Sequence, residues 1–260
     1  MVRCHSCGTS VENTYRFCPT CGEVLPEGGE TNPEGHAAID SEEETEMILK
    51  LTLIDKGGKA GQSFKLGPQE QVDHILGRED VDLSFPDDEY ISPRHARVYW
   101  EENRLWLQDL SSLNGVFVRI RGSSILKSGD QFLVGEQVLR FERRREIAPK
   151  KNKSEVPFSG SVFRPWIFKV VQVLAEKVNG AVWVSDGRRI TLGREQGTVQ
   201  FPYDQFMSRE HCRLEVGEQA CHLHDLQSRN GTYVRKYDRH PLKNGDYFFL
   251  GQKLLRVSIS

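Results

Sequence analysis

The sequence predicts an all-β protein that contains two antiparallel β-sandwiches in tandem behind a small N-terminal module. From Met47 onward, short runs of alternating apolar residues are broken by turn residues every 8 to 12 positions. This spacing is typical of sandwiches and barrels. No long amphipathic helix is evident. In addition, two stretches align on each other with a constant shift of 116 positions, which indicates that one domain occurs twice.

The residues that coincide under this shift are polar as well as apolar. They include Gly77-Arg78 with Gly193-Arg194, Ser92 with Ser208, His95 with His211, Asp109 with Asp225, and Asn114-Gly115 with Asn230-Gly231. A shared hydrophobic pattern alone would indicate only a shared fold. Shared Arg, Ser and Asn residues that lie far apart in the sequence indicate that both copies keep one polar site.

The chain divides into five expected segments. They are an N-terminal module at 1–22, an acidic flexible linker at 23–46, a first sandwich at 47–145, a basic flexible linker at 146–163 and a second sandwich at 164–260. The acidic linker has nine acidic residues and no Lys or Arg, so it is expected to repel itself and stay unfolded. Asn-Gly pairs at 114, 179, 230 and 244 are expected to form hairpin turns, because both residues tolerate positive φ.

Composition narrows the function classes. A formal net charge of -2 and a pI of about 6.5 give no global attraction to nucleic acid or acidic membranes. The mean hydropathy is -0.53, and the first residues are polar, so neither a membrane helix nor a secretory signal is expected. A cytoplasmic location follows as the expectation. Cys212 and Cys221 fall on Ala96 and Leu105 of the first copy, so both are expected to be buried, inert thiols.

The N-terminal module carries the other four cysteines in two close pairs, Cys4-x2-Cys7 and Cys18-x2-Cys21. A two-residue gap lets both thiolates of a pair face one metal ion. The segment resembles a zinc ribbon, which implies one structural zinc ion, because four thiolates leave no open coordination position. A segment this short has no core, so metal binding would supply most of its folding energy. A redox dithiol pair or two disulfides is the alternative.

Three motifs recur in fixed order in each repeat: Gly-Arg after an apolar strand, Ser-x-x-His, and Asp-Leu-x-Ser-x-Asn-Gly. Taken singly, such residues are ordinary surface ion pairs, caps and turns. Together they place a guanidinium, a hydroxyl and a carboxamide on loops that cluster at the ends of a sandwich. These groups suit an anion with several oxygens, such as a phosphate monoester. The motifs resemble a tandem of forkhead-associated (FHA) domains over about 200 of the 260 residues.

The FHA resemblance implies binding of phosphothreonine in an extended peptide. It assigns Arg78, Ser92, Arg194 and Ser208 to the phosphate, and Asn114 and Asn230 to the peptide backbone. Supporting roles fall to His95 and His211, to the expected turn residues Gly77, Gly115, Gly193 and Gly231, and to the charges of Arg209 and Arg229. The first repeat departs from the family, with Pro93 where Arg is frequent and Leu113 where Ser or Thr is frequent. The first site is therefore expected to be the weaker one.

No paired carboxylates, nucleophile elbow or nucleotide fingerprint stands in a supporting context, so an enzyme is not expected. The sequence predicts an adaptor whose partners are phosphothreonine proteins, namely a Ser/Thr kinase or its substrates. Thr45 in the acidic linker is a candidate for phosphorylation and self-binding. Two alternatives stay open: a nucleic-acid-associated regulator that uses the ribbon and the basic linker, and a scaffold that binds proteins without phosphate.

Overall fold

The computed structural model describes residues 2–3, 9–11, 48–66, 73–144, 166–175 and 177–260. The chain divides into two compact units, Met1–Glu44 and Thr45–Ser260. In the first unit, β1 (Val2–Arg3) pairs antiparallel with β2 (Ser10–Val11). The four cysteines expected to bind zinc, the acidic linker with Thr45 and most of the basic linker lie outside the described residues.

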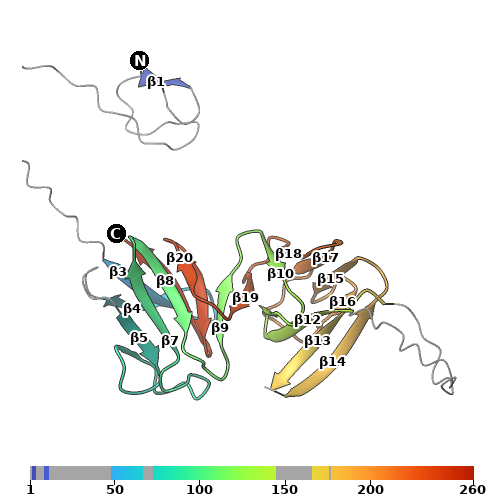
Figure 1. Cartoon of the computed structure of the whole chain (residues 1–260), viewed down its shortest axis with the longest axis horizontal. Coiled ribbons are helices and arrows are strands. Elements are labelled where there is room, and N and C mark those ends of the chain that lie inside the picture. Colours follow the sequence, from blue (N-terminus) through green and yellow to red (C-terminus); the bar gives the residue numbers. More distant parts are fainter. Residues whose placement is uncertain (1, 4–8, 12–47, 67–72, 145–165, 176) are drawn as a thin grey trace, which may run out of the picture. The chain divides into compact units, whose positions relative to one another are not determined.

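The described residues of the second unit form strands and no helix (Figure 1), which confirms the predicted all-β class. The first repeat contributes β3 (Leu49–Ile54), β4 (Ala60–Leu66), β5 (Asp73–Gly77), β6 (Leu83–Ser84), β7 (Ala96–Glu101), β8 (Arg104–Asp109), β9 (Val116–Arg119), β10 (Ser123–Leu126), β11 (Gln131–Val134) and β12 (Gln137–Arg143). The second contributes β13 (Phe168–Ala175), β14 (Val178–Ser185), β15 (Arg189–Gly193), β16 (Val199–Gln200), β17 (Cys212–Val216), β18 (Cys221–Asp225), β19 (Thr232–Lys236), β20 (His240–Leu242), β21 (Tyr247–Leu250) and β22 (Lys253–Ile259).

These strands build one ten-stranded sheet and two five-stranded sheets. The large sheet has the order β14-β13-β12-β11-β19-β9-β21-β22-β3-β4. The small sheets, β20-β8-β7-β5-β6 and β10-β18-β17-β15-β16, each pack on one half of it. All pairings are antiparallel except the short parallel pairs β5–β6 and β15–β16. Two sandwiches result, and they share the continuous large sheet.

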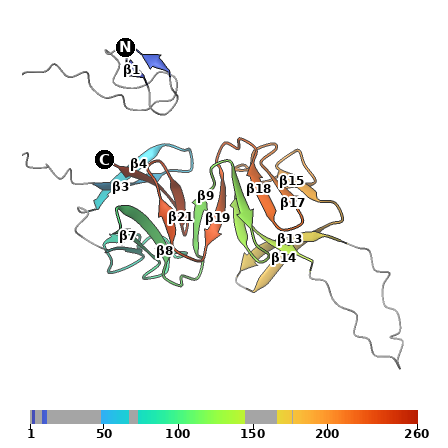
Figure 2. The same ribbon diagram turned by 45° about the horizontal axis from the view of Figure 1, so that its top comes forward.

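The two sandwiches exchange their last three strands. β20 and β22 of the second repeat pair with β8 and β3 of the first repeat. β10 and β12 of the first repeat pair with β18 and β13 of the second. The C-terminal strands, drawn in red, therefore lie beside β3 and β8 in Figures 1 and 2. This differs from the expectation that each contiguous repeat forms its own sandwich.

The exchange preserves both hydrophobic cores. The first core takes its exchanged side chains from the second repeat: Leu242, Phe248, Leu250, Leu255 and Val257. The second core takes the residues that lie 116 positions earlier: Leu126, Phe132, Val134, Leu139 and Phe141. All five pairs are apolar, and four of them are of similar size; the exception is Val257, whose counterpart Phe141 is larger. The two exchanged sets are therefore closely matched in pattern.

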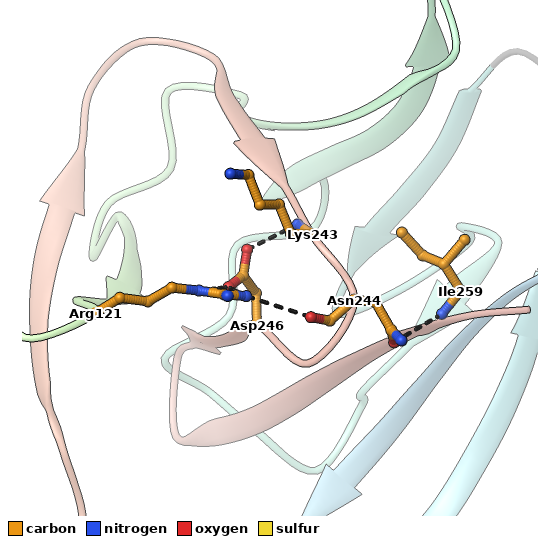
Figure 3. Close-up of polar contacts among 5 residues, drawn as sticks. All are labelled: Arg121, Lys243, Asn244, Asp246 and Ile259. Carbon is orange, nitrogen blue, oxygen red and sulfur yellow. Dashed lines mark hydrogen bonds and ion pairs between the residues drawn. The ribbon is translucent and has the colours of Figure 1, made fainter. Parts of the chain in front are cut away.

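The chain crosses between sandwiches after β9 and after β19, and these two strands pair antiparallel with each other. Figure 3 shows the first crossing, where the Arg121 guanidinium donates to Asp246 (Nη2 to Oδ1, 2.6 Å) and to the Asn244 carbonyl at 3.3 Å. Asp246 also accepts from the Lys243 amide at 2.7 Å. These bonds attach the end of β9 to the turn before β21.

Two local expectations about turns need correction. Asn179-Gly180 lies inside β14 rather than in a turn. The other three Asn-Gly pairs are turns, and Gly115, Gly231 and Gly245 have positive φ. They connect strands of different sheets, however, so they are not hairpins.

The two described cysteines match their prediction. Cys212 and Cys221 are buried, and burial raises the pKa of the Cys221 thiol to about 12. Both thiols are therefore protonated at neutral pH. In the described part of the chain, no helix is long and apolar enough to cross a membrane.

Candidate functional site

Each predicted site begins where a strand of the small sheet ends beside the loop that carries the Ser. The Arg78 amide donates to the carbonyls of Ser92 and Pro93, at 3.1 and 3.2 Å. Gly77 lies in β5, and a Cβ there would be 2.8 Å from the Pro93 carbonyl carbon. The second repeat matches: Arg194 donates to the Ser208 carbonyl at 2.9 Å, and a Cβ on Gly193 would lie 2.9 Å from the carbonyl carbon of Arg209. Gly77 and Gly193 are thus strand residues that permit close approach of a loop, not turn residues.

A buried histidine joins the Ser loop to the Asn-Gly turn. The Ser92 amide donates to Nδ1 of His95 at 3.1 Å, and Nε2 of His95 lies 3.1 Å from the Gly115 carbonyl oxygen. Because Nδ1 accepts a bond, the neutral ring carries its hydrogen on Nε2 and donates it to that carbonyl. Burial lowers the pKa of His95, which keeps the ring neutral. The same arrangement recurs at Ser208, His211 and Gly231, with distances of 3.0 and 3.1 Å.

The turn between β8 and β9 is bonded to the loop that carries Ser92 through two hydrogen bonds. The Leu113 amide donates to Oγ of Ser92 at 3.2 Å. Nδ2 of Asn114 donates to the Tyr90 carbonyl at 2.8 Å. A hydroxyl that accepts one bond still has a hydrogen to donate, and the Asn carboxamide keeps its oxygen as an acceptor. In the second repeat, the Arg229 backbone amide donates to Oγ of Ser208 at 3.0 Å, and Nδ2 of Asn230 donates to the Phe206 carbonyl at 2.7 Å.

The two arginine side chains are partly exposed and lie against the glutamate that follows each in sequence. Nε of Arg78 is 3.0 Å from Glu79, and Nη2 of Arg194 is 2.9 Å from Glu195. Arg209 also contacts Glu195, at 3.0 Å. Hydrogen bonding to Arg194 lowers the pKa of Glu195. Neither glutamate is among the site residues predicted from the sequence, although Glu79 falls on Glu195 under the same 116-residue shift.

A buried aspartate in each repeat was missed as well. Asp88 accepts a hydrogen bond from the Tyr90 amide at 3.0 Å. It also accepts one at 2.8 Å from the amide of Gln252, which lies in the turn between the exchanged strands β21 and β22. Its counterpart Asp204 accepts from the Phe206 amide at 3.0 Å and from the Glu136 amide at 2.8 Å. Each aspartate fixes the loop whose carbonyl holds the Asn amide. The 116-residue shift that relates Asp88 to Asp204 was the available signal.

The two sites differ in their surroundings. An open groove of about 520 Å³ adjoins Arg78 and is lined mainly by acidic and polar groups, including Glu79, Asp87, Glu89 and Gln252. Leu113 is exposed beside Ser92, whereas the equivalent residue of the second repeat, Arg229, is a cation. The second site is therefore the more cationic one on this loop.

This arrangement can bind an anion but offers little for catalysis. In each repeat, loops far apart in sequence bring together a guanidinium residue, a hydroxyl and a carboxamide. The described cysteines are buried, and the described residues include no group of three or more His, Cys, Asp or Glu suited to a metal ion. A polar binding site for an anionic ligand is the chemistry that fits.

Comparison with known proteins agrees with this geometry. The family model described as FHA domain matches residues 74–135 and 187–251, once in each repeat. The oxoglutarate dehydrogenase inhibitor of Corynebacterium jeikeium is 31% identical over 121 residues, which are 46% of this chain and 73% of that protein. The chain belongs to the FHA family.

Other relatives of this FHA protein match over shorter segments. The oxoglutarate dehydrogenase inhibitor of Corynebacterium efficiens is 33% identical over 93 residues, 35% of this chain and 63% of that protein. The glycogen accumulation regulator GarA of Mycobacterium tuberculosis is 33% identical over 93 residues, 35% of this chain and 56% of that protein. The match thus spans less than two thirds of the length of these two relatives.

A solved structure from a study of phosphothreonine-dependent FHA domain interactions is 14% identical to this chain in sequence. The match has a TM-score of 0.30 and covers 82% of this chain and 97% of that one. The relatives are named as an inhibitor and a regulator rather than as enzymes, which agrees with the expectation that this chain is not an enzyme.

Proposed function

We propose that this FHA protein is a phosphothreonine-peptide-binding adaptor in Ser/Thr kinase signalling. Arg78 and Ser92 would bind the phosphate of one peptide, with Asn114 on its backbone. In the second site, Arg194, Ser208 and Asn230 would take the same roles. The observation that best supports this proposal is the repeated hydrogen-bond framework, in which the Ser loop contacts both the Arg backbone and the turn that carries the Asn.

The ion pairs with Glu79 and Glu195 suggest why a phosphate would be required. Each guanidinium already has a carboxylate partner, and a ligand must compete with it. A phosphate near charge -2 with three acceptor oxygens competes well, whereas a threonine hydroxyl does not. Each charge-assisted contact contributes about 1.5 to 3 kcal/mol.

The proposed partners are phosphothreonine proteins, namely a Ser/Thr kinase or its substrates, met in the cytoplasm. Relatives named as an inhibitor of oxoglutarate dehydrogenase and a regulator of glycogen accumulation support a regulatory role, in which the FHA domain carries a phosphorylation signal to a metabolic target. The chemistry of the site supports this function over a phosphate-independent scaffold, because a scaffold has no need of an arginine, a serine hydroxyl and an Asn carboxamide held on adjoining loops in both repeats.

The test is a titration of the whole chain with a phosphothreonine peptide library and its unphosphorylated counterpart. Arg194→Ala is expected to weaken phosphopeptide binding at the second site at least about tenfold, since one charge-assisted contact is lost. Arg78→Ala should do the same at the first site. Arg188→Ala, an exposed arginine of the second repeat, is the matched control and should bind like the wild type. Equal binding of both peptide forms by the wild type would reject the proposal.

The N-terminal module is proposed to hold one structural zinc ion through Cys4, Cys7, Cys18 and Cys21. Four thiols in two close pairs are a donor set that suits tetrahedral zinc, and such a site would stabilise the short segment. Metal analysis of the purified chain should give one zinc per chain, and Cys18→Ser should lower that value. Zinc content below one tenth of an equivalent after purification with added zinc would argue against the ribbon.

A further inference from the structure

We propose that Arg235 and Arg119 are positioning residues, each for the peptide site of the opposite repeat. Arg235 belongs to the second repeat but would position the turn of Asn114 in the first site. Arg119 belongs to the first repeat but would position the turn of Asn230 in the second site. This inference rests on the proposed function for its ligand, and it concerns how the two sites depend on each other.

The strand pairing between the sandwiches creates these contacts. β9 and β19 run antiparallel with Arg235 opposite Phe117 and Arg119 opposite Tyr233, so each arginine reaches the Asn-Gly turn that precedes the partner strand. A Cβ on Gly115 would lie 2.6 Å from the guanidinium carbon of Arg235. A Cβ on Gly231 would lie 2.8 Å from the guanidinium carbon of Arg119. Each guanidinium therefore packs directly on the backbone of the opposite turn.

Both arginines are held in place on their other sides. Arg235 donates to Oε1 of Gln131 at 3.0 Å, and its guanidinium lies 5.1 Å from the ring centre of Tyr237. The guanidinium of Arg119 lies 5.5 Å from the ring centre of Tyr247. Stacking on an aromatic ring orients a planar guanidinium at little further entropic cost. Each arginine is thus a fixed support rather than a mobile surface side chain.

The supported turns carry the ligand-facing groups. The Gly115 carbonyl accepts from His95, which in turn accepts from the Ser92 amide, so a shift of the turn moves the Ser loop with it. Asn114 directly precedes Gly115 in the sequence, so its side chain moves with the same turn. Burial is the main cause of the lowered pKa of His95 and of His211, and the nearby charges of Arg235 and Arg119, respectively, act in the same direction. Loss of the guanidinium would leave space beneath the glycine and let the turn relax.

The test uses chains with a single functional site. Arg194→Ala leaves the first site, and Arg78→Ala leaves the second. A fluorescein-labelled phosphothreonine peptide library is the probe. Arg235→Ala is expected to weaken binding at least about fivefold in the Arg194→Ala chain, about 1 kcal/mol, and to change it less than twofold in the Arg78→Ala chain. Arg119→Ala should give the reverse pattern, and Arg188→Ala should affect neither chain.

Site selectivity separates positioning from a general loss of stability, which would weaken both sites together. Thermal unfolding shows whether the Arg235→Ala chain is folded. If it is not, Arg235→Met, which keeps the apolar part of the side chain, replaces it in the binding measurement. Arg235→Lys keeps the positive charge but lacks the planar guanidinium, so it should recover less than half of the binding energy that Arg235→Ala loses at the first site. Equal effects on both sites, no effect on the first site, or full rescue by Lys would each overturn the proposal.

A second readout does not depend on the ligand. Hydrogen exchange of the Gly115 amide, which donates to Ser112 Oγ at 3.0 Å, should speed up in Arg235→Ala. Exchange of the Gly231 amide should stay unchanged. If the single-site chains do not prefer phosphopeptide, the proposed function has failed, and this exchange pattern still decides whether Arg235 positions the turn. Unchanged exchange at Gly115 would overturn the positioning role.

Discussion

At the scale of single residues, the site depends on histidines that must stay neutral. His95 and His211 each accept a backbone hydrogen bond on Nδ1 and are buried, and burial lowers the pKa of both. His240 in β20 is a third histidine with a lowered pKa, outside the two proposed sites. Burial is the main cause that lowers its pKa to about 4; the charge of Lys236 adds to the shift, and Asp246 opposes it. Protonation of any of these rings would place a positive charge in an environment with little solvation, which is unfavourable.

The resulting pH dependence has a definite sign. Since the folded pKa lies below the unfolded value of about 6.5, the unfolded chain binds more protons, and the free energy of unfolding should fall as the pH drops from about 6.5 toward 4. Urea denaturation at pH 7, 6 and 5 measures this. His240→Gln should show a shallower decline than the wild type over that range. An identical decline in both would contradict the account of His240.

At the scale of elements, the Asn-Gly turns decide the geometry of the site. Gly231 has a φ of +86°, and a Cβ there would also collide with Arg119. Gly245 has a similar φ of +82°, but a Cβ there would meet nothing within 4 Å. Substitution of Gly245 therefore measures only the cost of the backbone conformation, whereas substitution of Gly231 adds the cost of crowding against Arg119.

Alanine substitution tests this difference. Gly245→Ala should lower the free energy of unfolding by about 1 kcal/mol, the cost of a left-handed non-glycine residue. Gly231→Ala should cost at least about 1 kcal/mol more, because Arg119 must also shift. Equilibrium urea denaturation of both variants gives the comparison. Equal losses would show that Arg119 does not press on the turn.

The sequence allowed the elements to be predicted better than their connections. Apolar alternation identified the strands, and the recurrence of Ser92 and Asn114 in the second repeat identified the loops of the site. Gly77 and Asn179 were misread as turn residues, because a glycine or Asn-Gly pair has the same local signature whether it forms a turn, permits close approach of a loop or lies in a strand. Only the tertiary contacts of each residue distinguish these cases.

At the scale of the whole molecule, the strand exchange could not have been predicted from the hydrophobic pattern. Phe132 and Phe248 occupy equivalent positions in the two repeats, and so do Leu139 and Leu255. Because most of these core positions carry matching apolar residues in both repeats, the hydrophobic pattern leaves the choice of sandwich open. In the exchanged arrangement, Arg121 pairs with Asp246 and β9 pairs with β19, and both contacts join the two repeats at the crossings.

The exchange predicts that the chain stays assembled when cut between its repeats. The test introduces a protease site within 146–163 and cleaves the chain there under non-denaturing conditions. Because each sandwich contains strands from both fragments, the fragments should elute together at the mass of the intact chain, 29.7 kDa. Light scattering during size-exclusion chromatography measures that mass. Separation into two lighter species of unequal mass would show that each repeat closes on itself.

The most direct test of the account is the number of phosphothreonine peptides that one chain binds. Isothermal titration of the intact protein should give two peptides for the wild type, one for Arg78→Ala, one for Arg194→Ala and none for the double variant. The unphosphorylated peptide should not bind any of them. A wild-type chain that binds both peptide forms alike, or a double variant that still binds two phosphopeptides, would contradict the assignment of the two sites.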